Sequence, residues 1–273
     1  MTKRPIVILP FIIIGFLESA ALELLYFATR PPLSAIADPV IRKFFGEPFI
    51  HYPGHLLILP KLFYYAQVAL YAAVSVALMA VSVNIFKNIK EGPHVRLDAM
   101  FKNVIKRYFG YLAYGCLIVI TLFLSNKAEI FLFSKVIFKL SSLLPQGVLT
   151  ALSFSLIFVL FITNVIIHTL LISTIPLMVI EKKTLLKSCG LSIYMGIRNF
   201  FKIFPLILLP FIIYLPFTLL KSFPNELADK TFPEINILVT FAGIIVTIFV
   251  DCFMLLSVSQ WLIDNRKGAR IAN

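Results

Sequence analysis

The feature that most constrains the fold of this chain is a series of six long apolar runs. A helix needs about 20 apolar residues to cross a hydrocarbon core about 30 Å thick. The third run reaches that length only if flanking residues join it. None of the runs shows the period-two alternation of a membrane β-barrel, so the sequence predicts an all-α, polytopic membrane helical bundle with about six transmembrane helices. The runs cover residues 5–28, 62–86, 109–124, 148–180, 203–220 and 237–259.

The composition excludes a soluble domain. Hydrophobic residues make up 60% of the 273 residues and charged residues only 14%. Soluble domains are about 45–50% apolar and about 25% charged, because their surfaces face water. We therefore expect residues 1–273 to form a single integral membrane domain.

The distribution of basic residues predicts the orientation of the chain. With six spans, the N-terminus, the second and fourth loops and the C-terminal tail lie on one side of the membrane. That side carries 16 of the 25 Lys and Arg residues, and the other side carries nine. Because positively charged loops stay in the cytoplasm, both termini are predicted to be cytoplasmic.

The first run has two interpretations. Lys3 and Arg4 precede an apolar stretch, and small residues follow at 19–21, as in a cleaved signal peptide. However, the run continues to Ala28, which is long enough for a span. The sequence favours an uncleaved first transmembrane helix.

The segment between the first two runs, residues 29–61, is predicted as an external loop in the membrane interface. It is too interrupted by proline to span the bilayer and too apolar to lie in water. Phe44, Phe45, Phe49 and Tyr52 are expected at headgroup depth. Its prolines are Pro31, Pro32, Pro39, Pro48, Pro53 and Pro60.

The two long cytoplasmic loops, residues 87–108 and 181–202, are each predicted to form an amphipathic helix on the membrane surface. Each places apolar residues against basic ones, which suits contact with anionic headgroups. The two loops align at an offset of 92 residues, through either an internal repeat or convergence on the same physical role. The predicted interfacial basic residues are Lys102, Lys106, Arg107, Lys187, Arg198 and Lys202.

A resemblance to a known family is carried by residues 175–204. Pro176 lies near the inner end of a predicted span, Glu181 marks its boundary, and Ser188 lies in the following helix. Phe200 and Phe201 then begin the next span. In these features the chain resembles a family of bacterial six-helix membrane proteins, which includes the membrane domain attached to some glycerophosphodiester phosphodiesterases. The resemblance implies this topology, in a bacterial plasma (inner) membrane, and implies no activity.

Ionisable residues within the spans are functional candidates because a charge inside the bilayer is costly. Glu18 and Glu23 lie in the first run, His168 in the fourth and Asp251 in the sixth. One interpretation is a proton or cation relay through Glu18, His168 and Asp251. The other is a set of hydrogen bonds that hold the bundle together. Glu18 and Glu23 lie about 140° apart on a helix, which weakens the case for a paired-carboxylate site.

No cofactor or metal site is predicted. His51 and His55 have the spacing of metal ligands on a helix, but Pro53 and Gly54 between them break a helix. No catalytic serine motif and no phosphate-binding glycine loop is present. The cysteines have no metal or disulfide spacing and are predicted to be packing residues: Cys116, Cys189 and Cys252.

These observations lead to three function hypotheses. The net charge is +12, and the basic residues responsible for it flank the spans. This distribution predicts anionic headgroups as partners and no nucleic acid. The leading hypothesis is a non-enzymatic scaffold or subunit of a membrane complex, with a membrane-protein partner. The alternative is a transporter or lipid-handling permease that uses Glu18, His168 and Asp251. A weaker third class is an intramembrane enzyme that acts on lipid through residues 47–55.

Overall fold

The computed structural model describes residues 5–91, 97–140 and 145–271. Of these residues 89% are helical, and none lies in a strand. The elements are η1 (Pro5–Val7), α1 (Leu9–Tyr26), α2 (Ser34–Phe45), η2 (Glu47–Ile50), α3 (Gly54–Leu70), η3 (Tyr71–Ser75), α4 (Val76–Glu91), α5 (Leu97–Ile105), α6 (Tyr108–Leu140), α7 (Gln146–Leu171), α8 (Thr174–Ile180), α9 (Leu185–Arg198), α10 (Phe200–Ser222), α11 (Pro224–Lys230) and α12 (Ile235–Ile271).

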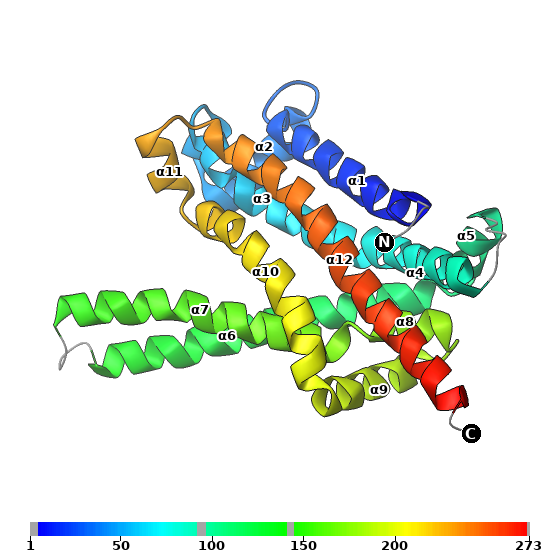
Figure 1. Cartoon of the computed structure of the whole chain (residues 1–273). Helices are drawn as coiled ribbons and strands as arrows, with labels where there is room; N and C mark the ends of the chain where they lie inside the picture. Colours follow the sequence, from blue (N-terminus) through cyan, green and yellow to red (C-terminus); the bar gives the residue numbers. More distant parts are fainter. Residues whose placement is uncertain (1–4, 92–96, 141–144, 272–273) are drawn as a thin grey trace.

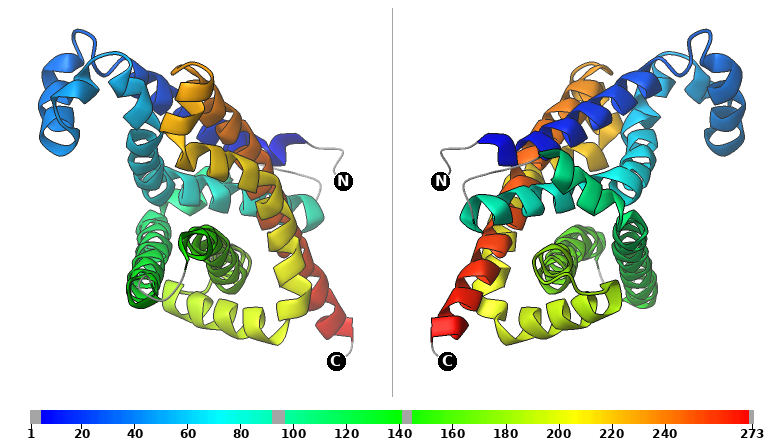
Figure 2. Two further views of the ribbon diagram at one scale, coloured as in Figure 1. Left: turned by 90° about the vertical axis from the view of Figure 1, so that its left-hand side faces the viewer. Right: turned by 90° about the vertical axis from the view of Figure 1, so that its right-hand side faces the viewer.

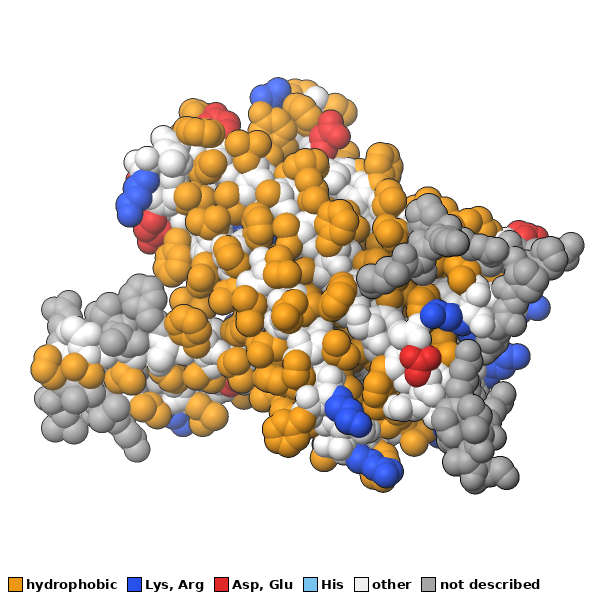
Figure 3. Space-filling model, viewed as in Figure 1, with side chains coloured by type: hydrophobic (Ala, Val, Ile, Leu, Met, Phe, Trp, Pro, Cys, Tyr) orange, Lys and Arg blue, Asp and Glu red, His pale blue; other side chains and the backbone are white. Residues whose placement is uncertain are grey.

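Six helical segments of the described chain are long and apolar enough to cross a membrane. The predicted all-α bundle with six transmembrane helices is therefore confirmed. Apolar side chains cover the middle of the face shown in Figure 3. The spans are Leu9–Tyr26, Gly54–Lys90, Tyr108–Val136, Ser155–Ile180, Phe200–Ser222 and Ile235–Asn265.

The second span begins earlier than the sequence predicts. Because α3 starts at Gly54, the last part of the predicted loop 29–61 is helical, and the predicted boundary is wrong there. Pro60 lies inside α3 and removes one backbone hydrogen bond. The helix continues through Pro60 because Leu59 and Phe63 are buried in a cluster with residues of α1 and α12. The remainder of the loop forms α2 and η2, which stand beside the bundle (Figure 2).

The third span is longer than predicted. Instead of ending near residue 124, α6 continues to Leu140 and pairs with α7 in a hairpin that projects from the bundle (Figure 1). Only 6% of its most apolar segment is buried inside the protein. The large side chains Phe123, Phe131 and Leu132 are exposed. This surface is suited to contact with lipid chains.

The fourth span is not one helix from 148 to 180, as predicted, but two. The break lies at Ile172 and Ser173, between α7 and α8. Tyr114 of α6 is buried there, and its hydroxyl donates a hydrogen bond to the carbonyl oxygen of Leu171 (2.9 Å). A side chain from a neighbouring helix therefore satisfies a carbonyl group at the helix end, where intrahelical partners are missing.

A single π-helical turn, η3, joins α3 to α4. The Val76 amide donates to the carbonyl oxygen of Tyr71, five residues earlier. The hydroxyl of Tyr108 donates to the carbonyl oxygen of Ala73 (2.7 Å). Gly115 of α6 packs on this turn so closely that a Cβ atom there would lie 2.7 Å from the Cα atom and carbonyl oxygen of Ala72. The π turn is thus held by contacts from α6.

The centre of the bundle is α12, which crosses the molecule and packs against α1, α3, α4, α8 and α10 (Figure 1). The largest buried cluster joins η1, α1, α4, α6 and α8. It includes the fully buried residues Val76 and Ile85 of α4. α3 and α10 both pack against α12, and the candidate site lies between them.

The two predicted amphipathic helices are α5 and α9. Both lie at the end of the bundle where α1 starts and α12 ends, and α9 crosses below α7 (Figures 1 and 2). α5 buries Met100 and Val104. α9 buries its small residues Ser192 and Gly196 against α7, and leaves Leu186 81% exposed. Because the two helices bury different kinds of residue, the internal repeat stays a prediction.

Candidate functional site

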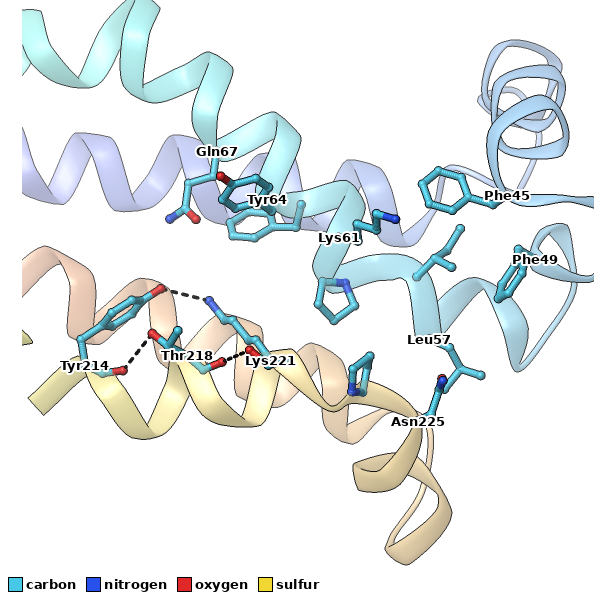
Figure 4. A pocket seen from close by; sticks show the side chains of 15 residues that line it. Phe45, Phe49, Leu57, Lys61, Tyr64, Gln67, Tyr214, Thr218, Lys221 and Asn225 are labelled. Atoms are coloured by element: carbon cyan, nitrogen blue, oxygen red, sulfur yellow. Dashed lines mark hydrogen bonds between the residues drawn. The ribbon is translucent and has the colours of Figure 1, made fainter. Parts of the chain in front are cut away.

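A cleft of about 690 Å³ lies between α3 and α10, near α2, η2 and α11 (Figure 4). Its walls are mainly apolar and aromatic, with a few polar groups, which is the usual character of a small-molecule site. No acidic side chain is among the described residues that line it. The lining residues include Phe45, Phe49, Leu57, Lys61, Phe63, Tyr64, Gln67, Tyr214, Thr218, Lys221 and Asn225.

Two lysines enter the cleft from opposite walls. Lys61 of α3 lies over the Phe45 ring, with 5.2 Å between its Nζ atom and the ring centroid. Lys221 of α10 lies 5.9 Å from the Phe63 ring centroid and donates a long hydrogen bond to the Tyr214 hydroxyl (3.5 Å). Aromatic faces attract these cations but do not neutralise them. The cleft therefore presents positive charge between apolar walls.

A glycine on α12 makes room for Lys221. A Cβ atom at Gly243 would lie 2.7 Å from the Lys221 Nζ atom and 3.0 Å from its Cε atom. The side chain of Lys221 thus runs directly over the α12 backbone. The position of its ammonium group depends on the absence of a side chain at residue 243.

Polar groups continue from the cleft into the bundle. Gln67 of α3 donates a hydrogen bond from Nε2 to the Oε2 atom of Glu18 on α1 (3.1 Å). Glu18 is 5% exposed. It interacts electrostatically with both Lys221 and Asp251. Four helices therefore contribute to one intramembrane polar cluster, formed by Glu18, Gln67, Tyr214, Lys221 and Asp251.

Of the residues predicted from the sequence, Glu18 and Asp251 are brought together and the other two are not. Glu23 is exposed on α1. His168 of α7 packs against Phe211, with ring centroids 5.0 Å apart, and its Nδ1 atom lies 2.8 Å from the carbonyl oxygen of Asn164. It does not line the cleft. The structure thus gives no contact between His168 and the two carboxyl groups among its described interactions.

Gln67, Tyr214 and Lys221 are missing from the candidate site residues predicted from the sequence. A signal for part of this set does exist in the chain. Tyr214, Thr218 and Lys221 are spaced by four and three residues, so they share one face of an otherwise apolar helix. Gln67 has no comparable partner on its own helix, and only the packing of α1 against α3 shows its role.

The part of the chain that the structure describes shows no feature that favours a metal or a nucleophile. In the described residues, no group of three or more His, Cys, Asp and Glu could hold a metal ion. His51 precedes α3 and is exposed, whereas His55 is buried in its first turn. Burial raises the pKa of the Cys189 thiol, which favours the unreactive protonated form.

The predicted interfacial basic residues are exposed on or beside α5 and α9. Lys106 and Arg107 form the turn between α5 and α6. Lys102 lies on α5 and Lys187 on α9. Arg198 is the last residue of α9, and Lys202 lies in the first turn of α10.

No protein-family model matches the chain, and comparisons with curated proteins and with solved structures find no significant similarity. The resemblance to a bacterial six-helix membrane family therefore stays a prediction. The chemistry of the cleft has to be inferred from its own residues.

Proposed function

We propose that the protein is a lipid-handling permease that takes up an anionic amphiphile, such as phosphatidylglycerol, in the cleft between α3 and α10. The observation that carries this proposal is the presence of two lysines, one from each wall, in a mainly apolar cleft of a membrane-spanning bundle. The scaffold or subunit role and the absence of catalysis stay predictions. No described feature favours either over lipid handling.

The lysines explain the choice of an anionic headgroup. Lys221 is near the end of α10 and Lys61 is in the second turn of α3, so both lie near headgroup depth. A phosphate that enters the cleft gains a charge-assisted hydrogen bond from each lysine it reaches, and such bonds are stronger than neutral ones. The apolar walls, with Phe45, Phe49 and Leu57, suit the lipid chain beside it.

The polar cluster gives the headgroup a path inward. Gln67 lies six residues beyond Lys61 and Tyr214 seven residues before Lys221, so the path extends about 10 Å along both helices. A phosphate at its inner end meets the carboxyl groups of Glu18 and Asp251. Because like charges repel strongly at low dielectric constant, passage requires protonation of at least one of them. This assigns the two acids a gating role in which His168 takes no part.

We further propose that the cleft opens toward the outside of a bacterial inner membrane, with both termini in the cytoplasm. The unequal distribution of Lys and Arg supports this orientation. α5 and α9, which carry Lys102, Lys187 and Arg198, lie at the end opposite α11 (Figure 1). The lipid would then enter from the outer leaflet.

The test is lipid movement in proteoliposomes. Fluorescent phosphatidylglycerol or phosphatidylcholine is incorporated in both leaflets, and dithionite bleaches the accessible one. We expect the wild-type protein to move phosphatidylglycerol faster than phosphatidylcholine. Lys221→Gln removes a charged hydrogen-bond donor, which is worth about 1.5–3 kcal/mol, so it should slow the movement at least about tenfold.

Lys135→Gln is the matched control. Lys135 also lies over an aromatic ring, 4.2 Å from the Phe131 centroid, but on the α6–α7 hairpin outside the cleft. Its replacement should leave the rate unchanged. Equal movement of both lipids, or equal rates for the wild type and Lys221→Gln, would refute the proposal.

A further inference from the structure

A second cavity, of about 210 Å³, lies at the opposite end of the bundle from the cleft. It is formed by the end of α4, the turn between α5 and α6, and the end of α8. No acidic side chain is among the described residues that line it. They are Asn84, Lys87, Asn103, Val104, Lys106, Arg107, Tyr111, Met178, Val179 and Lys182.

The cations of this cavity come from segments distant in sequence. Arg107 is fixed by a long hydrogen bond from its Nη1 atom to the carbonyl oxygen of Met178 (3.4 Å), which ties the α5–α6 turn to α8. Its backbone amide donates to the carbonyl oxygen of Val104 (2.9 Å). A guanidinium group has five N–H donors, so this contact leaves others to face a ligand. Lys106 lies beside it in the same turn.

Lys182 reaches the cavity through an unusual backbone conformation. Its φ of 53° lies in the left-handed region, which costs free energy for any residue with a Cβ atom. It follows Glu181, the C-cap of α8, and glycine is the residue that normally occupies this position. Such conformations cluster at functional sites. A lysine here is therefore better explained by its charge than by the backbone.

The described residues that line the cavity are basic or neutral. Glu181, the acid next to Lys182, forms an ion pair with Lys183 (2.5 Å). Neutral donors add to the cations. The Oδ1 atom of Asn84 accepts a hydrogen bond from Asn88 (3.2 Å), so the NH₂ group of Asn84 can donate to a ligand. The amide of Asn103 also lines the cavity.

We propose that this cavity binds a phosphate group, carried by an anionic lipid headgroup or free in solution. Arginine recognises phosphate oxygens through paired N–H groups, and lysines add point charges. Basic pockets between transmembrane helices at a membrane surface bind lipid headgroups in this way. The site is separate from the cleft and shares no lining residue with it.

The experiment uses full-length detergent-purified protein that carries Lys61→Gln and Lys221→Gln, so that the cleft does not contribute. Native mass spectrometry follows titration with phosphatidylglycerol or phosphatidylcholine, and calorimetry follows titration with inorganic phosphate. Into this background we introduce Arg107→Gln with Lys182→Gly. The glycine suits the left-handed backbone, so the fold should be retained. A thermal melt checks this.

The double change Arg107→Gln and Lys182→Gly should weaken binding at least tenfold. The control removes the same charge elsewhere at this end of the bundle, with Lys187→Gln and Arg198→Gln on α9, and should change binding less than twofold. Selective binding of phosphatidylglycerol that is lost only in the first pair supports a lipid source. Phosphate binding lost only in that pair supports a free-phosphate source. The proposal would be overturned if neither phosphatidylglycerol nor inorganic phosphate bound, or if the two pairs of substitutions weakened binding equally.

Discussion

Replacement of Gly243 by leucine is expected to slow lipid movement through the cleft strongly, although Gly243 does not line it. A Cβ atom at this position would lie 2.7 Å from the Lys221 Nζ atom, and a leucine side chain needs more space still. The lysine side chain is flexible, so it can move away from α12 more easily than the backbone can. The ammonium group would then leave its position beside Tyr214, 3.5 Å away. We expect a rate at least about tenfold lower, matching the loss of one charge-assisted hydrogen bond.

A double-mutant comparison separates this effect from a general loss of stability. If Gly243→Leu acts through Lys221, then adding Lys221→Gln should cause little further loss, because the two changes remove the same interaction. Gly243→Ala should cause a smaller loss than Gly243→Leu. Additive losses for the two changes, measured in the same dithionite assay, would show that Gly243 acts independently of Lys221.

Gly115→Ala is expected to destabilise the protein strongly. The new Cβ atom would lie 2.7 Å from the Cα atom and carbonyl oxygen of Ala72, and these backbone atoms cannot rotate away. Overpacking of this kind costs about 1–3 kcal/mol. We expect a clear fall in the melting temperature of the detergent-purified protein, followed by circular dichroism.

The same substitution at Gly190 is the control. No atom outside the helix lies within 4 Å of a Cβ atom there, and the residue is exposed within α9. Alanine favours the helix by up to about 1 kcal/mol relative to glycine, so Gly190→Ala should leave the melting temperature equal or higher. If both variants melted at the same temperature, the close packing of α6 on η3 would not matter for stability.

The number of spans could be predicted from the sequence because an apolar run long enough to cross the bilayer has few structural alternatives to a transmembrane helix. The helix boundaries could not. Pro60 suggests a stop, but the burial of Leu59 and Phe63 keeps α3 helical through it. At Ile172 the sequence does hold a sign of the break, because Pro176 has no N–H to donate to the Ile172 carbonyl oxygen four residues earlier, but hydropathy alone does not show it. The contacts that decide both places lie between helices: the burial of Leu59 and Phe63, and the hydrogen bond from Tyr114. A pattern along one helix does not contain them.

The candidate site was predictable only in part, for a similar reason. The cost of burying a charge identifies Glu18 and Asp251 as unusual wherever they lie. The same reasoning selects His168, although the structure places it in separate contacts with Phe211 and Asn164. Gln67 carries no charge and gives no such signal. Its importance comes from the single hydrogen bond to Glu18.

The π turn at η3 makes the cleft sensitive to the length of the chain. A π turn holds one more residue than an α turn, so α3 and α4 differ in phase from a continuous α-helix. Loss of one residue from Tyr71–Ser75 would restore that phase and rotate α3 by about 100° relative to α4. Gln67 would turn away from Glu18, while hydropathy would hardly change. The alignment of the polar groups thus depends on a one-residue insertion.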